Sequence, residues 1–408
     1  MEEFNIYLGE KRITVTNDDG GVSEGQEAFI VDRNFIVAAI ARYLKDVHEN
    51  DKHFRPMYLH TCQYVDYENK QVLVREKSTK GEMYIPYDLL IGCDGVRSVV
   101  REAMIKRHPD FSCHVRDIFQ RFKAVHVERP PALSSKGMSV LPSILKHAQG
   151  IALPEKGNQV NISVGYPLNL FDDEVDEEIK SSDYKVVSKY FKENFKAFEL
   201  ADYDDFAKQW VGQRWNQTGQ LNCNMYHSNA MNIILMGDAA HATSPSIGMG
   251  MNTALRDAQA LYNLLKENKD DLETTLPAYS KARVKEGNSL STMAVNLFCL
   301  DSKVQMKESI KSVIRGFLHK KMPSIVSNDP QALIGLRGMD LSDVYDLATK
   351  LNIIPKLRAI NEKIIHEHFE KTHGMVKPVE KGNKGRIMGG AMLVALSSMM
   401  AWNFMNDA

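Results

Sequence analysis

One run of residues, from Asn232 to Leu265, constrains the fold of this chain more than any other feature. Its first part, Ile233 to Met236, is apolar and predicts a short buried strand, and Gly237-Asp238 predicts a turn. A loop rich in proline and glycine follows, and an amphipathic helical pattern begins near Thr253. This order places free backbone N–H groups and the positive end of a helix dipole beside any ligand that lies over the loop.

The residue types in this run suit a cofactor with a polyol chain and a flat ring. Gly248 and Gly250 carry no Cβ, so the backbone can approach a flat ligand closely. Asp238 follows the strand and can accept hydrogen bonds from sugar-like hydroxyl groups. Free N–H groups near a helix start favour a ring edge that becomes anionic. These properties together describe reduced flavin.

The same run resembles the second flavin-binding motif of the FAD-dependent aromatic hydroxylases, the class A flavoprotein monooxygenases. The cofactor-binding residues that this resemblance implies are Gly237, Asp238, Pro245, Gly248, Gly250, Met251 and Asn252. In the family the Asp binds the ribityl chain, the Pro lies beside the isoalloxazine ring, and the Gly-x-Gly amides face its pyrimidine edge. The alternative is a strand–loop–helix turn whose glycines serve only tight packing.

A second stretch, from Tyr87 to Arg101, supports the resemblance. An apolar run predicts a buried strand that ends at Asp94-Gly95, and a helix start with Ser98 follows. It is similar to the Asp-Gly motif of the same family, whose Asp lies near the FAD pyrophosphate in the region that NAD(P)H visits. An isolated Asp-Gly pair usually marks only a turn. Here the two motifs occur in the family's order, with room for a substrate domain between them.

A third, shorter match is Arg33, which precedes a helical pattern. In the family the corresponding Arg reaches FAD. The equal alternative is that Arg33 is only a surface residue near the start of a helix. The apolar residues of the helical pattern are Phe35, Ile36, Ala39, Ile40, Tyr43 and Leu44.

The first 32 residues depart from the family pattern. Members of this group begin with a strand and a Gly-x-Gly-x-x-Gly turn that receives the ADP half of FAD. This chain instead has a glycine cluster, Gly20-Gly21, after polar residues, which predicts a hairpin turn between polar strands. We therefore expect a chain that resembles the family without its first βαβ unit, as a shortened gene model or an alternative start would give. FAD binding would be weaker without that unit.

The expected fold class is α/β, with an FAD/NAD(P)-binding three-layer (Rossmann-like) domain that is N-terminally incomplete. An inserted α+β substrate domain and a helical C-terminal part complete it. Alternating patterns in His53–Tyr84 predict antiparallel strands, strand patterns recur in Cys113–Asn222, and a long helix is expected to begin at Pro277. The expected parts are residues 1–110 and 223–300 for the FAD-binding domain, 111–222 for the substrate domain, 301–386 for the helical region with a basic linker, and 387–405 for a candidate transmembrane tail.

Composition favours an intracellular enzyme. The net charge of -1 over 408 residues argues against a nucleic-acid partner. The odd number of scattered cysteines, without metal-ligand spacing, predicts a reducing compartment, no metal site, and a packing role for each cysteine. No signal-peptide pattern follows the acidic start. The cysteines are Cys62, Cys93, Cys113, Cys223 and Cys299.

The C-terminal segment has a different character. Residues 387–405 contain no charged residue and follow a basic stretch that includes Lys384 and Arg386. An uncharged, mostly apolar segment of about 18 residues or more can span a bilayer, and flanking cations favour the cytosolic side. We therefore expect a tail anchor in an organelle membrane, with the enzyme domain facing the cytosol. A buried or partner-binding helix is the alternative, because the segment also holds glycines and serines.

The resemblance implies an FAD-dependent monooxygenase that uses NAD(P)H and O₂ to hydroxylate an aromatic or apolar small molecule through a flavin C4a-hydroperoxide. The cofactor performs the difficult step, so no catalytic triad is needed and no catalytic residue is assigned. His241 is expected to make a structural hydrogen bond. Two alternatives remain: a flavin-dependent reductase that does not hydroxylate, and a non-catalytic, membrane-anchored remnant of the family.

Within the family, the chain is most similar to the kynurenine 3-monooxygenase-like members. The added likeness covers Tyr279–Arg283, Met322–Ser324 and the C-terminal segment. Asn296 matches a substrate-side Asn on the long helix. The residues that should bind an amino-acid carboxylate are not matched, because Glu27 stands near Arg33 where a cation is needed. The family is therefore expected, but kynurenine is not expected as the substrate.

Overall fold

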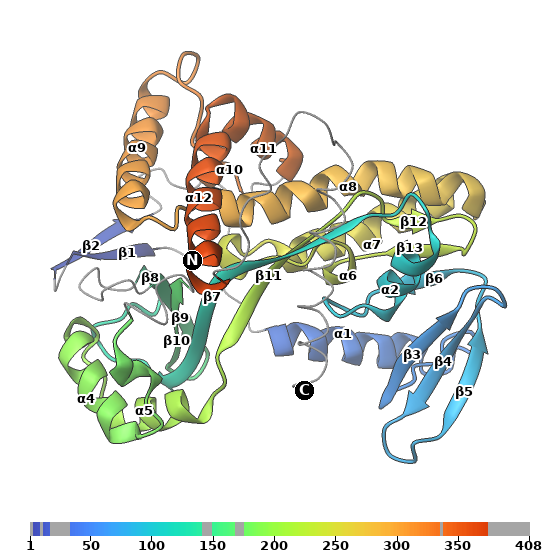
Figure 1. Ribbon diagram of the computed structural model, residues 1–408, viewed down its shortest axis with the longest axis horizontal. Helices are drawn as coiled ribbons and strands as arrows, with labels where there is room; N and C mark the ends of the chain where they lie inside the picture. The colour runs from blue at the N-terminus through green and yellow to red at the C-terminus, as the bar shows by residue number, and fades with distance from the viewer. Residues whose placement is uncertain are drawn as a thin grey trace.

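The computed structural model of the protein describes residues 3–8, 11–16, 33–140, 149–167, 175–334 and 338–373. Three β-sheets occupy the first part of this described chain, and most of it after residue 250 is helical (Figure 1).

A three-stranded sheet carries both predicted flavin motifs. β6 (Leu90–Gly92) runs parallel to β13 (Ile233–Leu235), and β12 (His227–Ser228) pairs antiparallel with β13 on the other side. The carboxyl ends of parallel strands lie at the same end of a sheet, where α/β proteins bind their ligands. The segments that begin at Asp94 and at Gly237 therefore leave the sheet at the same end.

The prediction that the strand before Asp94 is buried was only partly right. Gly92 is buried, but the side chain of Ile91 is 40% exposed. The reason is that β6 is the outer strand of this sheet among the described residues, so its outer side is not covered by another described strand.

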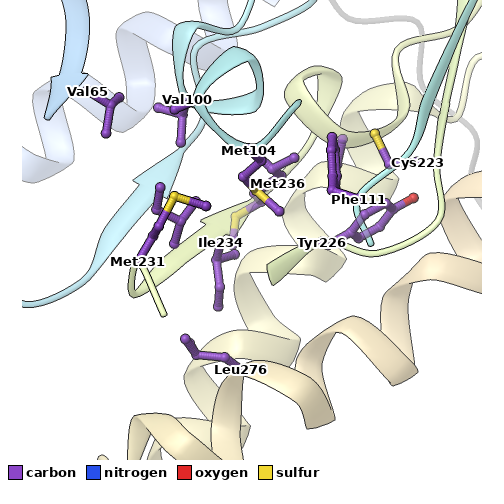
Figure 2. Close-up of a cluster of buried hydrophobic side chains, with 14 of the residues drawn as sticks. Val65, Val100, Met104, Phe111, Cys223, Tyr226, Met231, Ile234, Met236 and Leu276 are labelled. Atoms are coloured by element: carbon purple, nitrogen blue, oxygen red, sulfur yellow. The ribbon is translucent and has the colours of Figure 1, made fainter. Parts of the chain in front are cut away.

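An apolar core joins this sheet to the helices on both of its faces (Figure 2). Val100 of α2 (Val99–Arg107) lies on the same side of the sheet as the side chain of Leu235, while Leu276 of α8 (Leu272–Asn296) lies near Ile234 on the other side. Two further features belong to this part: the antiparallel sheet predicted between residues 53 and 84, and the helix that follows the second flavin motif. They are β3 (His60–Asp66), β4 (Gln71–Glu76), β5 (Glu82–Pro86) and α7 (Gly250–Glu267).

The second large unit is a seven-stranded sheet in the order β11-β7-β10-β9-β8-β1-β2. All of its pairs are antiparallel except β1 with β8. The helices α4 (Tyr184–Asn194) and α5 (Tyr203–Gly212) pack on it through a large aromatic core (Figure 1). The strands are β11 (Asn216–Cys223), β7 (Cys113–Glu128), β10 (Gln159–Pro167), β9 (Gln149–Glu155), β8 (Gly137–Val140), β1 (Glu3–Leu8) and β2 (Lys11–Thr16).

The structure has an N-terminal hairpin that the sequence did not predict. β1 and β2 pair with each other around residues 9–10, whereas Gly20-Gly21 lies outside the described residues. β1 also pairs with β8, so residues 3–16 belong to the seven-stranded sheet and not to the sheet that carries the flavin motifs. The alternation of Ile13 and Val15 with polar residues is the strand signal that places the hairpin here.

The long helix begins earlier than predicted. α8 (Leu272–Asn296) starts five residues before Pro277, because the side chain of Asp271 accepts a hydrogen bond from the Glu273 N–H and caps the first turn. Pro277 has no N–H for the Glu273 carbonyl. That carbonyl instead accepts a hydrogen bond of 3.2 Å from Asn229 Nδ2, which satisfies it and allows proline inside the helix.

Helices fill the C-terminal part. α11 and α12 pack against α8. None of the helices among the described residues is long and apolar enough to cross a membrane, and residues 387–405 lie outside the described residues. The helices are α9 (Ser302–Lys321), α10 (Pro330–Leu333), α11 (Leu341–Lys350) and α12 (Ile353–His373).

Near the other end of the chain, the helix predicted after Arg33 is confirmed as α1 (Arg33–His48). Its apolar side chains Phe35, Ile40 and Tyr43 are exposed in the described structure.

A lysine is buried in the aromatic core of the seven-stranded sheet. Lys123 Nζ donates a 2.7 Å hydrogen bond to the Trp210 carbonyl and lies over the rings of Trp210 and Trp215. Burial lowers the pKa of Lys123 to about 8, since the charged ammonium loses its hydration.

Folding stability should therefore rise with pH between about 8 and the ordinary lysine pKa of about 10.4, because the unfolded chain keeps the proton that the folded chain releases. The rise should be on the order of 1–3 kcal/mol. Lys123→Met should remove it, while the exposed Lys208→Met should not. Urea unfolding at pH 7.5 and 9.5 measures the difference. Equal pH slopes for the wild type and Lys123→Met would contradict the effect.

Candidate functional site

The structure brings the second predicted motif together as one continuous strand, loop and helix. After β13 the chain turns at Gly237 with φ +59, a conformation that favours glycine, and enters the one-turn helix α6 (Asp238–His241). A 3₁₀ turn (Pro245–Ile247) follows and ends at Gly248, whose φ is +67. α7 then begins at Gly250. The predicted order of turn, loop and helix is confirmed.

This loop offers open space and free donors. Apart from the adjoining backbone and the neighbouring residues of the chain, no described atom lies within 4 Å of where a Cβ would stand at Gly248 or Gly250, so no other part of the described structure fills the space beside them. The N-cap of α7, Met249, provides no side-chain acceptor, and the first N–H groups of a helix lack intrahelical partners. The Asp238 side chain is exposed at the start of α6. The loop can therefore receive a ligand rich in hydroxyl groups and hydrogen-bond acceptors.

The first motif has a structural role that the sequence did not predict. Asp94 Oδ2 accepts hydrogen bonds from the backbone N–H groups of Val99 at 2.7 Å and Val100 at 3.3 Å. The Ser98 hydroxyl accepts another from the Arg101 N–H. Asp94 and Ser98 therefore cap the N-terminus of α2. Gly95 has φ +81, and the space where its Cβ would stand is open. The contact of Asp94 with FAD stays a prediction.

Arg101 links the two motifs directly. Its Nη1 donates a 2.8 Å hydrogen bond to the Ala239 carbonyl of α6, and its Nη2 donates to the Val96 carbonyl beside Asp94. The side chain is 7% exposed. A buried guanidinium thus holds together two segments that lie 138 residues apart in the sequence.

A buried carboxylate fixes the turn that presents Asp238. Asp257, on α7, accepts hydrogen bonds from the Gly237 N–H at 3.1 Å and from Arg283 Nε at 2.7 Å, and it lies 2.6 Å from His241 Nε2. Asp257 is fully buried, and Arg283 and His241 are nearly so. The prediction of a structural hydrogen bond for His241 is confirmed. One carboxylate thus ties the turn, α6, α7 and α8 together.

The charges in this cluster favour the ionised carboxylate. Burial alone would raise the pKa of Asp257. The hydrogen bonds and positive charges of His241 and Arg283 outweigh that effect and hold the pKa of Asp257 below its usual value. The cluster is therefore ionic at neutral pH.

Sequence reasoning missed Asp257, Arg283 and Arg101 as parts of the site, although a signal for Asp257 was present. Thr253, Asp257 and Leu261 follow one another at four-residue spacing and are the buried residues of α7. A charged residue on the inward stripe of an amphipathic helix indicates a buried partner of opposite charge.

Four further residues were predicted to contact the cofactor or the substrate. Met251 and Asn252 are exposed in the first turn of α7, and Arg33 is the first residue of α1. Asn296 is 2% exposed near the end of α8. The Ser246 hydroxyl donates a 2.6 Å hydrogen bond to the carbonyl of Ala294, which brings the proline loop close to that end of α8. The contacts of these four residues with a cofactor or substrate stay predictions.

Among the described residues, no group of three or more His, Cys, Asp or Glu side chains could hold a metal ion.

A comparison with protein families identifies the family of the chain. A model described as an FAD binding domain matches residues 63–291, which is more than half of the chain. The chain belongs to this FAD-binding family. The match includes both motifs and the Asp257 cluster, and it confirms the resemblance to FAD-dependent aromatic hydroxylases and the α/β fold class inferred from the sequence.

Characterised relatives are distant in sequence. Violacein synthase of Chromobacterium violaceum is 23% identical over 314 residues, which cover 75% of this chain and 71% of that protein. Kynurenine 3-monooxygenase of Caenorhabditis briggsae is 26% identical over 282 residues. The corresponding enzyme of Phaeosphaeria nodorum is 30% identical over 222 residues. The chain spans 59% and 43% of the lengths of these two kynurenine 3-monooxygenases.

Solved structures share the fold. The tetrameric form of 2-methyl-3-hydroxypyridine-5-carboxylic acid oxygenase matches with a TM-score of 0.56 and 14% identity, over 81% of this chain and 76% of that one. A variant of Klebsiella pneumoniae HpxO complexed with FAD matches with a TM-score of 0.54 and 16% identity, over 87% of this chain and 83% of that one.

Replacing the central carboxylate should destabilise the protein strongly. Asp257→Asn keeps the size of the side chain but leaves Arg283 buried without a counter-charge, which should cost about 3–5 kcal/mol of unfolding free energy. Because the pKa of Asp257 is lowered in the folded chain, its contribution is present above the unfolded value of about 3.9 and is lost as the pH falls through the folded value. In Asp257→Asn, which has no carboxylate at this position, the free energy of unfolding should not show this decrease at low pH. Urea unfolding between pH 7 and pH 3 measures both effects.

The matched control is Asp346→Asn, because Asp346 forms an exposed ion pair with Lys285. This control should change the unfolding free energy little. A cost for Asp257→Asn no larger than that of the control would show that the buried cluster does not hold the turn.

A methyl group at Gly287 should disturb the same region from α8. A Cβ at this position would overlap Tyr226 Oη and the ring of His241. Overpacking of this kind costs about 1–3 kcal/mol, so Gly287→Ala should lower the midpoint of urea unfolding. Gly316→Ala in α9 is the control, since no atom surrounds its Cβ position and alanine favours a helix there. If both variants are equally stable, the close packing inferred around His241 is wrong.

Proposed function

We propose that this protein is an FAD-dependent monooxygenase that uses NAD(P)H and O₂ to hydroxylate an aromatic or apolar small molecule. One observation carries the proposal. The Asp94 segment and the Gly237 segment leave the same end of the β6–β13 pair, and the buried Arg101 joins them into one surface. A cofactor with an ADP half and a flavin half needs two such segments side by side.

The residues at this surface fit FAD. The exposed Asp238 carboxylate can accept hydrogen bonds from ribityl hydroxyls, and the open space at Gly248 and Gly250 admits a flat ring close to the backbone. The uncapped N–H groups at the start of α7 suit the electron-rich edge of that ring. A loop whose glycines served only tight packing would have neighbours at these Cβ positions. The remaining proposed FAD contacts are Arg33, Asp94, Gly95, Pro245, Met251 and Asn252.

The cofactor and the protein would have different roles in the reaction. FAD, when bound and reduced by NAD(P)H, supplies the activation of O₂ and the transfer of one oxygen atom. The chain's own residues bind the cofactor, orient the substrate and exclude water. The resemblance to kynurenine 3-monooxygenases supports oxygen transfer in preference to reduction alone.

Further parts of the proposal concern the substrate and the membrane. The seven-stranded sheet with α4 and α5 would form the substrate side, and Asn296 is the proposed substrate contact because the Ser246 hydrogen bond joins its end of α8 to the proline loop. Residues 387–405 are proposed as a membrane anchor on the basis of their uncharged composition and basic flank.

The Asp238→Ala variant tests the cofactor site. Loss of hydrogen bonds to a charged acceptor should weaken FAD binding by about 10–100-fold, while unfolding by urea should stay unchanged because Asp238 is exposed. Titration of the chain with FAD, followed by flavin fluorescence, measures the affinity. Asp343→Ala, an exposed carboxylate in the first turn of α11, is the control. If Asp238→Ala lowers the free energy of unfolding but leaves the FAD affinity unchanged, Asp238 has a structural role and does not bind FAD.

Product analysis separates the activities. A monooxygenase should oxidise NAD(P)H and release a hydroxylated product only when O₂ is present. A substrate reduced under anaerobic conditions would make the protein a reductase, and a chain that binds no FAD would contradict the proposal altogether.

A further inference from the structure

Two cysteines face each other across the pair of strands β7 and β11. Cys113, the first residue of β7, is directly opposite Cys223, the last residue of β11. The next pair of opposite residues along the two chains, Ser112 and Asn224, is a hydrogen-bonded pair, because the Asn224 N–H donates to the Ser112 carbonyl at 3.1 Å. The Cys223 carbonyl points away from β7 and accepts a hydrogen bond from Asn288 Nδ2. Cys113 and Cys223 therefore form a non-hydrogen-bonded pair of the antiparallel ladder.

This position suits a disulfide. In a non-hydrogen-bonded pair the Cα atoms are about 4.5 Å apart and the side chains approach each other closely. Disulfides require Cα atoms about 4.4–6.8 Å apart, so a bond can form without a large movement of the strands. Both cysteines are free in this structure.

The two sulfurs have different environments. Cys223 is buried beside Phe111 and Tyr226 (Figure 2), whereas Cys113 is partly exposed. The hydrogen bond from Cys223 lowers the pKa of the Cys113 thiol, and the charge of Arg101 adds to this effect against the opposing effect of burial. Partial loss of hydration and the negative charge of Asp94 raise the pKa of the thiols of Cys62 and Cys93 instead. Cys113 is thus the reactive sulfur, since thiolates are the nucleophiles, and Cys223 is its neighbour.

We propose that Cys113 and Cys223 form a redox site that hydrogen peroxide converts to a disulfide. The Cys113 sulfur attacks one peroxide oxygen, the O–O bond breaks, and a sulfenic acid and one water form. The Cys223 sulfur then attacks the Cys113 sulfur, the S–O bond breaks, and the hydroxyl group leaves as a second water with the Cys223 proton. Two thiols and one peroxide thus give one disulfide and two waters. This assignment replaces the expectation that these two cysteines serve packing alone.

The position of the bond gives it a structural consequence. β7 and β11 are neighbouring strands of the seven-stranded sheet, and one end of this pair reaches the core that carries the flavin motifs (Figure 1). The two cysteines lie at that end of the pair. A disulfide would fix the two strands to each other where they leave the core. It would close a long loop of the chain, and it should raise the Tm by about 2–6 °C.

Peptide mapping of the oxidised full-length chain tests the site. The protein is treated with a small molar excess of hydrogen peroxide, alkylated and digested without reduction. We expect a linked peptide pair that contains Cys113 and Cys223, a loss of two of the five thiols, and their recovery with dithiothreitol. Peroxide is added directly, so the result does not depend on whether the protein binds flavin.

Serine variants test the order of the two steps. Cys223→Ser should accumulate a sulfenic acid at Cys113 that dimedone traps, and the control Cys62→Ser should still form the linked peptide. Mapping of the unaltered chain decides the question even if a variant fails to fold. Oxidation of Cys93 or Cys62 while Cys113 and Cys223 remain free to alkylate would overturn the proposal. A link between two chains would overturn it as well.

Discussion

The buried carboxylate of Asp257 is the interaction on which the candidate site depends. A charge removed from water is tolerated only when donors surround it, and here the Gly237 N–H, His241 and Arg283 do so. Each donor belongs to a different element. The geometry of the turn that presents Asp238 is therefore set by the packing of α7 against α8, and not by the loop alone.

The parallel pair of β6 and β13 provides the second constraint. It brings two short segments to the same end of a sheet, and Arg101 then fixes their separation through the carbonyls of Val96 and Ala239. Because both carbonyls accept from one guanidinium, a shift of either segment would leave a buried donor without a partner. Two loops from distant parts of the chain thus behave as one rigid surface, which is what a long cofactor requires.

The sequence predicted the features that local chemistry determines. The glycine turn at Gly237, the loop to Gly250 and the helix after it follow from residue type and spacing, and the structure confirms them. Contacts over long sequence distances were not predictable from one sequence. The acceptance of Pro277 inside α8 depends on Asn229, and the role of Arg101 depends on a carbonyl 138 residues away. Local patterns give elements, whereas the partners of buried polar groups are set by tertiary packing.

Hydrogen exchange with and without FAD would test the central claim most directly, because it reports each backbone amide separately. If the two segments form one cofactor surface, FAD should slow exchange at residues 95–101 and at residues 238–253 together, over the same range of FAD concentration. Asp257→Asn should weaken the protection of both segments, because Arg101 couples them. Protection of only one segment, or protection confined to other parts of the chain, would contradict the account.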